Sequence, residues 1–263
     1  TGDGCGLLLR KPDSFLRAVT DGLFAQPLAE LYGVGMIFLS QDEEKAKKAK
    51  ARLEAEFVAQ DLKVVGWRRV PVNLEPCGDT ARSSLPIIEQ VFVEGDNLVE
   101  HMLNVKLFVA RRKAELALVD DEDFYIPSLS SSMLCYKGLV MPADLPEFYL
   151  DLKDSRMETA IVTFHQRFST NTQPRWPLAQ PFRLLAHNGE INTIQGNRNW
   201  SVSRTAKFSS GLLPDLDQIT PLVNQSGSDS SSMDNMLELL LAGGVDLYRA
   251  VRMLVPPAWQ NDE

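Results

Sequence analysis

The run Gly33-Val34-Gly35-Met36-Ile37-Phe38-Leu39 constrains the fold more than any other segment, because a stretch without a polar side chain must be buried. Its short length and its bounding glycine predict a buried strand. Asp42 follows closely and is a residue type that caps helices. Beyond it, apolar side chains recur at helical spacing, at Ala46, Ala49, Leu53 and Phe57. The sequence therefore predicts a buried strand followed by an amphipathic helix.

Segments of both kinds continue along the chain, without a long linker or an internal repeat. The other predicted strands are residues 62–72, 91–93, 157–169 and 182–187, with two extended pieces within 125–140 that form a hairpin or adjacent strands. The other predicted helices are residues 13–25, residues 97–118, and one that starts in a capping box of Ser231 and Asp234 and ends before Gly243. The helix over 97–118 is expected to turn Leu98, Met102, Val105 and Val109 inward. This mixture predicts one α/β-type domain.

Charge and composition exclude several classes of partner. The 27 Lys and Arg residues against 35 Asp and Glu give a net charge of -8, which repels nucleic acid and anionic lipid. No apolar run approaches the ~20 residues that a membrane span needs, so a soluble protein is expected. Three cysteines are too few for a disulfide framework and favour a reducing, cytoplasmic location. The chain opens at Thr1 without a secretory signal, and we expect it to be part of a longer protein.

Metal and phosphate sites are not predicted. The three histidines stand apart, and the acidic run Asp120 to Asp123 is more typical of a solvated turn than of a metal site. The pair Gly33 and Gly35 lacks the third glycine of a dinucleotide-binding loop. A Cys–His hydrolase, with Cys5 near His165 or His187, stays open as an alternative, although a buried cysteine is more often a small core residue.

Polar residues concentrate in two segments, 165–172 and 186–193. Arg167 follows a predicted strand, and its guanidinium can bind a carboxylate with two parallel hydrogen bonds. Asn188 and Gly189 offer a side-chain amide beside an unencumbered backbone N–H, which suits an oxyanion hole. The alternatives are a tight turn at Asn188-Gly189 and a surface ion pair at Arg167.

These segments resemble a known family. Residues 165–172, 179–199 and 227–230 are similar to the class II glutamine amidotransferase domain of glutamate synthase large subunits. The segments 1–6, 136–138 and 257–259 fit the same family, so the resemblance covers nearly all of residues 1–263. It implies an α+β fold, the N-terminal-nucleophile hydrolase αββα sandwich with two antiparallel sheets, and the release of ammonia from L-glutamine.

The resemblance also implies roles for four residues. Arg167 would bind the α-carboxylate of glutamine, Asn188 and Gly189 would stabilise the oxyanion, and Asp229 would pair with the α-amino group. A zwitterionic amino acid needs a cation and an anion at its two ends, so these roles are physically reasonable. For Asp229 the alternative is a favourable interaction with the dipole of the helix that starts beside it.

The family's nucleophile is a cysteine at the mature amino terminus, whose own α-amine acts as the general base. Thr1 occupies the first position here, and Cys5 becomes terminal only if residues 1–4 are removed. A rival alignment places residues 1–6 downstream of the family's amino terminus. On that alignment the first strand and its cysteine are missing, residues 1–263 are a partial domain, and this chain alone is not expected to hydrolyse glutamine.

For the full-length enzyme, the resemblance implies that ammonia passes to a synthase domain that aminates 2-oxoglutarate. FMN, an iron–sulfur cluster and NADPH are expected in that enzyme and in its small-subunit partner, with no cofactor in the domain formed by residues 1–263. A non-catalytic glutamine-binding or docking module remains the alternative function.

Overall fold

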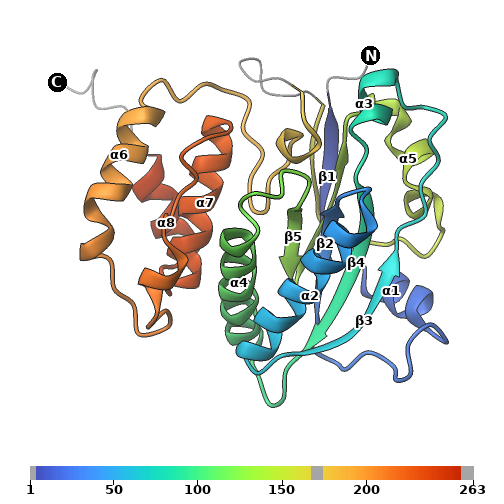
Figure 1. The fold of residues 1–263 in the computed structure, drawn as a ribbon, viewed down its shortest axis with the longest axis horizontal. Coiled ribbons are helices and arrows are strands. Elements are labelled where there is room, and N and C mark those ends of the chain that lie inside the picture. Colours follow the sequence, from blue (N-terminus) through green and yellow to red (C-terminus); the bar gives the residue numbers. More distant parts are fainter. Residues whose placement is uncertain (1–3, 167–173, 256–263) are drawn as a thin grey trace. The chain divides into compact units, whose positions relative to one another are not determined.

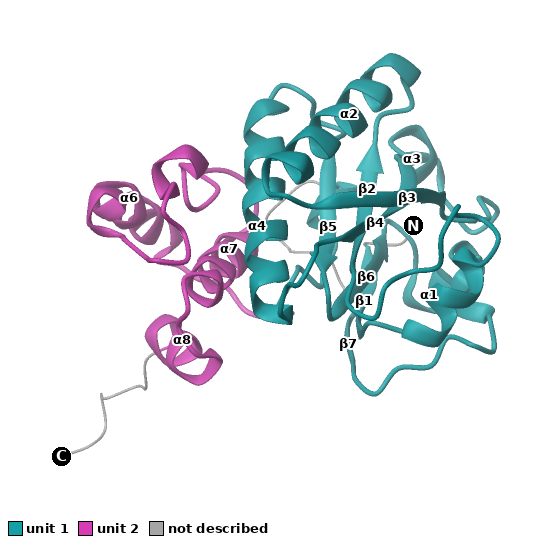
Figure 2. Ribbon diagram, turned by 90° about the horizontal axis from the view of Figure 1, so that it is seen from below, with its two compact units in different colours: residues 1–188 teal, residues 189–263 magenta. Residues whose placement is uncertain are grey.

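The computed structural model describes residues 4–166 and 174–255, which form two compact units (Figures 1 and 2). Unit 1 is Thr1–Asn188 and unit 2 is Gly189–Glu263. Each unit is presented by itself.

Unit 1 is built on two antiparallel sheets (Figure 1). The smaller sheet has the strand order β6 (Met133–Gly138), β1 (Cys5–Arg10), β7 (Val162–His165). The larger has the order β3 (Lys63–Arg69), β4 (Ile87–Glu94), β2 (Gly33–Leu39), β5 (Tyr125–Ser130). Short helices lie in the connections: α1 (Asp13–Thr20), α3 (Asp79–Ser83) and α5 (Leu145–Phe148).

Strand β2 shows how the layers of unit 1 are arranged. All of its residues are buried, and alternate side chains point to opposite faces of the sheet. Val34, Met36 and Phe38 belong to the core shared with the smaller sheet. Ile37 and Leu39 belong to a second core, shared with helices α2 (Glu43–Ala59) and α4 (Glu100–Ala117). The larger sheet therefore lies between a helical layer and the smaller sheet, and the expected α+β sandwich class is confirmed.

Helix α2 forms where the sequence predicts it. The Asp42 side chain accepts hydrogen bonds from the backbone N–H groups of Glu44 (2.9 Å) and Lys45 (3.1 Å), so it caps the helix as expected. The predicted apolar stripe is buried against the sheet: Ala46, Ala49, Leu53 and Phe57.

The predicted inner face of α4 is only partly right. Val105 is buried, but Met102 and Val109 are half-buried. The residues that pack in the core shared with the larger sheet are Leu103, Leu107, Ala110 and Ala114. Each of these residues lies five positions beyond a predicted one, which is about 140° around the helix axis. Because α4 carries apolar residues on more than one side, its helical period alone could not select the correct face.

The two extended pieces within 125–140 are strands β5 and β6, but they do not pair as a hairpin. They belong to different sheets, so the chain crosses from one sheet to the other between them. Asn104 of α4 fixes this crossing: its Oδ1 accepts from the backbone N–H of Ser131 (2.9 Å), and its Nδ2 donates to Ser131 Oγ (2.7 Å).

Several predicted boundaries were wrong. The helix predicted at 13–25 ends at Thr20, and the extended stretch at 91–93 is the middle of the longer β4. Within 157–169, the described residues form a strand only at Val162–His165, and Ser169 lies outside the described residues. Residues 182–187 form no strand; Phe182 N–H donates to Leu185 O (2.9 Å) in a turn instead. Strand β1 was not predicted.

Unit 2 contains three α-helices in its described part: α6 (Ile194–Arg204), α7 (Asp229–Ala242) and α8 (Leu247–Leu254) (Figure 2). The predicted start of α7 at Ser231 was wrong, because Ser228 is its N-cap and accepts a hydrogen bond from Ser231 N–H (3.1 Å). Asp229 is therefore the first residue of the helix. Across both units, no helix among the described residues is long and apolar enough to cross a bilayer.

Candidate functional site

Gly6 of β1 brings two of the predicted site segments to one place in unit 1. It pairs with His165 of β7, so the strand that leads toward Arg167 ends beside it. Gly6 also lies close to Gln180: a Cβ at position 6 would be only 2.8 Å from the backbone oxygen of Gln180. Glycine is needed here because the backbone approaches so closely. The segments that lead to Arg167 and to Asn188 thus both start next to Gly6, although Arg167 itself lies outside the described residues.

The segment before Asn188 is closed into a loop by the side chain of Gln180. Gln180 Nε2 donates to His187 O (2.9 Å), and Gln180 Oε1 accepts from His187 N–H (2.8 Å). Gln180 is 2% exposed, whereas Asn188 is exposed. The contact occupies both backbone groups of His187, which a neighbouring strand would otherwise bind. Sequence reasoning missed Gln180, because a lone glutamine carries no local signal.

A second contact joins the same loop to helix α4. Glu115 Oε1 accepts from Arg183 Nη2 (2.9 Å) and from Arg111 Nη1 (2.7 Å), and Glu115 Oε2 accepts from Arg112 Nη1 (2.9 Å). Burial by itself would raise the pKa of Glu115, but Arg111, Arg183 and Arg112 outweigh it and lower the pKa from 4.5 to about 2. The loop before Asn188 is therefore attached to α4 through a carboxylate that stays ionised.

The lowered pKa of Glu115 predicts that the stability of the fold depends on pH. Because the folded-state pKa of Glu115 lies below its unfolded value, its contribution is fully present above about pH 4.5 and is lost as the pH falls toward 2. We expect Glu115→Gln to remove up to about 3 kcal/mol of that contribution at pH 7. The measurement is urea unfolding between pH 7 and pH 3. Glu147→Gln, at an exposed carboxylate that pairs with Lys153, is the matched control. Parallel stability profiles for Glu115→Gln and the unaltered protein would contradict the assignment.

In unit 2, Asp229 lies next to the loop that begins at Gly189. Its Oδ2 accepts from the backbone N–H of Ile191 (2.6 Å), and its Oδ1 accepts from the backbone N–H of Ser230 (2.6 Å). Asp229 is half-buried in the first turn of α7. Its carboxylate thus occupies the favourable end of the helix dipole and also contacts the loop that carries Gly189.

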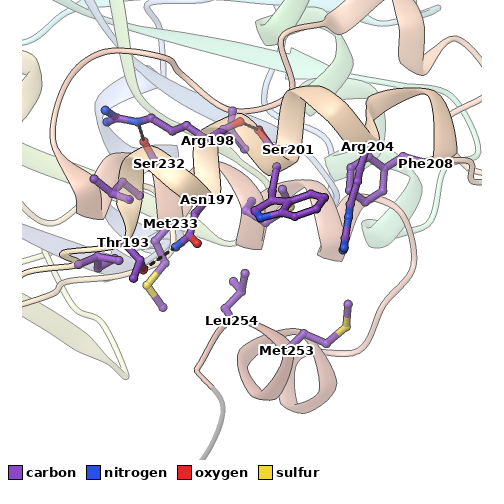
Figure 3. Close-up of a pocket in the computed structure, with 15 residues that line it drawn as sticks. Thr193, Asn197, Arg198, Ser201, Arg204, Phe208, Ser232, Met233, Met253 and Leu254 are labelled. Carbon is purple, nitrogen blue, oxygen red and sulfur yellow. Dashed lines mark hydrogen bonds between the residues drawn. The ribbon is translucent and has the colours of Figure 1, made fainter.

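The turn before Asp229 is fixed by Arg198 of α6. Arg198 Nε donates to Ser232 Oγ (2.9 Å), as Figure 3 shows. Its Nη2 donates to the backbone oxygens of Gly227 (3.1 Å) and Ser228 (3.2 Å). Arg198 is buried, and its partners lie far from it in the sequence, so nothing local in the sequence pointed to this role.

A pocket of about 550 Å³ lies among α6, α7 and α8 of unit 2 (Figure 3). Apolar side chains form much of its wall, including Trp200, Met233, Met236 and Met253. No carboxylate is found among the described residues that line it, so the pocket offers no partner for an ammonium group. This pocket is therefore not a candidate site for a zwitterion.

The cysteines do not provide a nucleophile. Cys5 is 1% exposed in the core between the sheets, and burial, followed by the charge of Asp144, raises its pKa to about 12. Side chains alternate along β1, so Cys5 faces away from the side shared by Gly6 and its partner His165. Cys77 and Cys135 are also buried, and none of the three forms a disulfide. The Cys–His alternative built on Cys5 is therefore not supported.

The described residues contain no cluster of histidine, cysteine, aspartate or glutamate with the geometry of a metal site. The predicted site residues offer charged side chains, a side-chain amide and a backbone N–H donor. Such groups bind an amino acid and stabilise an oxyanion.

Known proteins that are similar to this chain include glutamate synthases. The chain is 42% identical to the glutamate synthase [NADPH] large chain of Bacillus subtilis (strain 168), over 100% of this chain and 17% of that protein. It is 40% identical to the ferredoxin-dependent glutamate synthase 1, chloroplastic/mitochondrial, of Arabidopsis thaliana, over 99% of this chain and 16% of that protein. It is 37% identical to the glutamate synthase [NADH] of Saccharomyces cerevisiae (strain ATCC 204508 / S288c), over 99% of this chain and 13% of that protein.

The chain thus spans about one sixth of the length of these relatives. The model of the family "Glutamine amidotransferases class-II" matches residues 1–263. The chain belongs to the class-II glutamine amidotransferases.

Proposed function

We propose that this chain is the glutaminase domain of a glutamate synthase, which hydrolyses L-glutamine to glutamate and ammonia. The observation that carries the proposal is the match of the class-II amidotransferase family to the whole of residues 1–263. The relatives named glutamate synthase support the choice within that family.

The four site residues have complementary roles in this proposal. Arg167 binds the α-carboxylate of glutamine through its planar guanidinium, and Asp229 binds the α-ammonium group. The Asn188 side-chain amide and the Gly189 N–H donate hydrogen bonds to the oxygen of the reacting carboxamide. The contact of Asp229 with Ile191 N–H supports the assignment, because it places a carboxylate beside the loop that follows Gly189.

The reaction proceeds in two steps. A thiol sulfur attacks the carboxamide carbon, the C–N bond breaks, and ammonia leaves with the proton that the thiol gave up. Water then attacks the thioester carbon, which releases the γ-carboxylate of glutamate and restores the thiol. Because Cys5, Cys77 and Cys135 are all buried, we assign the thiol to residues that precede this chain in the full-length protein. Residues 1–263 are then a partial domain that acts together with that segment.

For the full-length protein, we propose that ammonia passes to a synthase domain of the same polypeptide that aminates 2-oxoglutarate. FMN, an iron–sulfur cluster and NADPH act there and in a small-subunit partner. The described residues of this chain contain no group of three or more ligand side chains that could hold the cluster. The free thiols of Cys5, Cys77 and Cys135 support a cytoplasmic location for the protein.

The test is ammonia release from L-glutamine by the full-length protein, with Asp229→Asn as the diagnostic variant. Asparagine keeps an acceptor for Ile191 N–H but removes the negative charge, so we expect KM for glutamine to rise about tenfold, which corresponds to ~1.4 kcal/mol. Asp246→Asn is the matched control, because Asp246 also accepts a backbone hydrogen bond at the start of a helix in unit 2.

An unchanged KM in Asp229→Asn would refute the role of Asp229 in binding. Heat of glutamine binding without ammonia release from the full-length protein would identify a non-catalytic glutamine-binding module instead. Ammonia release whose KM responds to Asp229→Asn and not to Asp246→Asn would support the proposal.

A further inference from the structure

The loop that carries Asn188 is held by one side chain at its two ends. Gln180 stands at the start of the loop, and its amide makes two hydrogen bonds to the backbone of His187, at 2.8 and 2.9 Å. His187 directly precedes Asn188. The two bonds use both the N–H and the C=O of His187, so they fix the orientation of the peptide groups on each side of that residue.

Gln180 can fix this loop because it is itself fixed. Its side chain is buried. Its backbone oxygen lies so close to Gly6 that a Cβ at that position would be only 2.8 Å from it. The next residue is also attached to the smaller sheet, since the Cys135 thiol donates to Pro181 O (3.6 Å). Gln180 therefore holds His187 in a fixed position relative to β1 and β6.

We propose that Gln180 is a positioning residue for Asn188, which it holds in place to stabilise the oxyanion formed from glutamine. The inference rests on the proposed function. Oxyanion donors accelerate a reaction only when they are already aimed at the oxygen that gains charge. A shift of about 1 Å can cost ~100-fold in rate, so a loosely held Asn188 would lower the rate of the chemical step more than the affinity for substrate.

The test compares Gln180→Ala, Gln180→Glu and Gln41→Ala in the full-length protein. Gln41 is the matched control, since its Nε2 donates to a backbone oxygen, that of Leu85 (3.0 Å), elsewhere in unit 1. The rate of ammonia release is divided by the number of sites that bind L-glutamate in a calorimetric titration. This division removes the effect of any misfolded fraction.

We expect Gln180→Ala to lower kcat per binding site about tenfold and to leave KM within twofold. Glu at position 180 keeps the acceptor for His187 N–H and loses the donor to His187 O, so its kcat should lie between those of Gln180→Ala and the unaltered protein. Gln41→Ala should match the unaltered protein.

Two results would overturn the inference alone: a kcat per site in Gln180→Ala within twofold of the unaltered protein, or a rise in KM with kcat unchanged. Absence of ammonia release from the unaltered protein would instead refute the proposed function, and the inference with it. Amide hydrogen exchange at residues 187–189 should become faster in Gln180→Ala, and unchanged exchange would also contradict the role of Gln180.

Discussion

Replacing Arg167 by alanine in the full-length protein is expected to lower kcat/KM for L-glutamine about 100-fold. The removal of one partner from a desolvated, hydrogen-bonded charge pair costs about 2–5 kcal/mol, and ~1.4 kcal/mol corresponds to a factor of ten. Arg167 lies two residues beyond His165, the last residue of β7, which pairs with Gly6 of β1. It therefore follows the strand that ends beside the segment leading to Asn188.

Two comparisons make the role of Arg167 specific. Arg167→Lys keeps the charge but loses the planar pair of donors, so it should recover only part of the activity. Arg175→Ala is the matched control, because Arg175 is half exposed and pairs with Glu122 on the surface. The rate of ammonia release against glutamine concentration is the measurement.

A substrate without the α-carboxylate sharpens the test. With 4-aminobutanamide, which is glutamine lacking that group, Arg167→Ala should change kcat/KM by no more than about threefold. Equal losses with both substrates would mean that Arg167 supports the fold of the site and does not bind the carboxylate. No loss with glutamine would reject the role entirely.

Replacing Asp151 by asparagine is expected to lower the free energy of unfolding by about 3–5 kcal/mol. Asp151 accepts from Arg68 Nη2 (2.7 Å) and Nη1 (2.8 Å), and also from the Tyr136 hydroxyl (3.0 Å). Both charged side chains are buried. Asparagine has nearly the same shape, but it removes the negative charge and points an amide N–H₂ at groups that are themselves donors. The Arg68 cation then stays in the core without the carboxylate that neutralises it.

The matched control for Asp151 is Asp154→Asn. Asp154 also binds an arginine through both oxygens, Arg156, but that pair is solvent-screened and should contribute much less than the buried pair. Urea unfolding followed by circular dichroism gives both values. A loss below 1 kcal/mol for Asp151→Asn, or equal losses for the two variants, would contradict the importance of the buried pair.

The hydrogen bonds around Asp151 also explain why Asp151→Asn should lower the free energy of unfolding so strongly. Arg68 belongs to β3 of the larger sheet and Tyr136 to β6 of the smaller sheet, and Gln90 of β4 contacts both. These hydrogen bonds join the two sheets within a largely apolar core. Loss of the shared carboxylate therefore weakens the packing of one sheet on the other.

Local sequence patterns were sufficient to predict the helices and strands that have a strong hydrophobic period or a clear cap. The apolar run at β2 predicted a buried strand with the correct bounds, because a stretch without polar side chains has few other stable environments. Asp42 and the stripe that follows it predicted α2 correctly. The resemblance to class II amidotransferases named Arg167, Asn188, Gly189 and Asp229, and these roles remain predictions.

The pairing of strands could not be read from the same patterns. β5 and β6 were recognised as extended, but only the fold shows that they belong to two different sheets, with Asn104 of α4 bound to the crossing between them. The face of α4 was chosen wrongly because the helix is apolar on more than one side. In both cases the deciding partner lies on another element of the fold.

Local patterns in the sequence determined strand β2 and helix α2, and the resemblance of its motifs to class II amidotransferases determined the α+β class and the family and predicted the residues that bind glutamine. Periods and motifs are properties of neighbouring residues. Only the tertiary structure decided how the candidate site is supported: Gln180 binds His187, Glu115 binds Arg183, and Arg198 binds the turn before Asp229. Each of these contacts needs a closed loop or two elements brought together by folding. A lone glutamine, glutamate or arginine has the same local sequence signature whether it supports a site or faces the solvent.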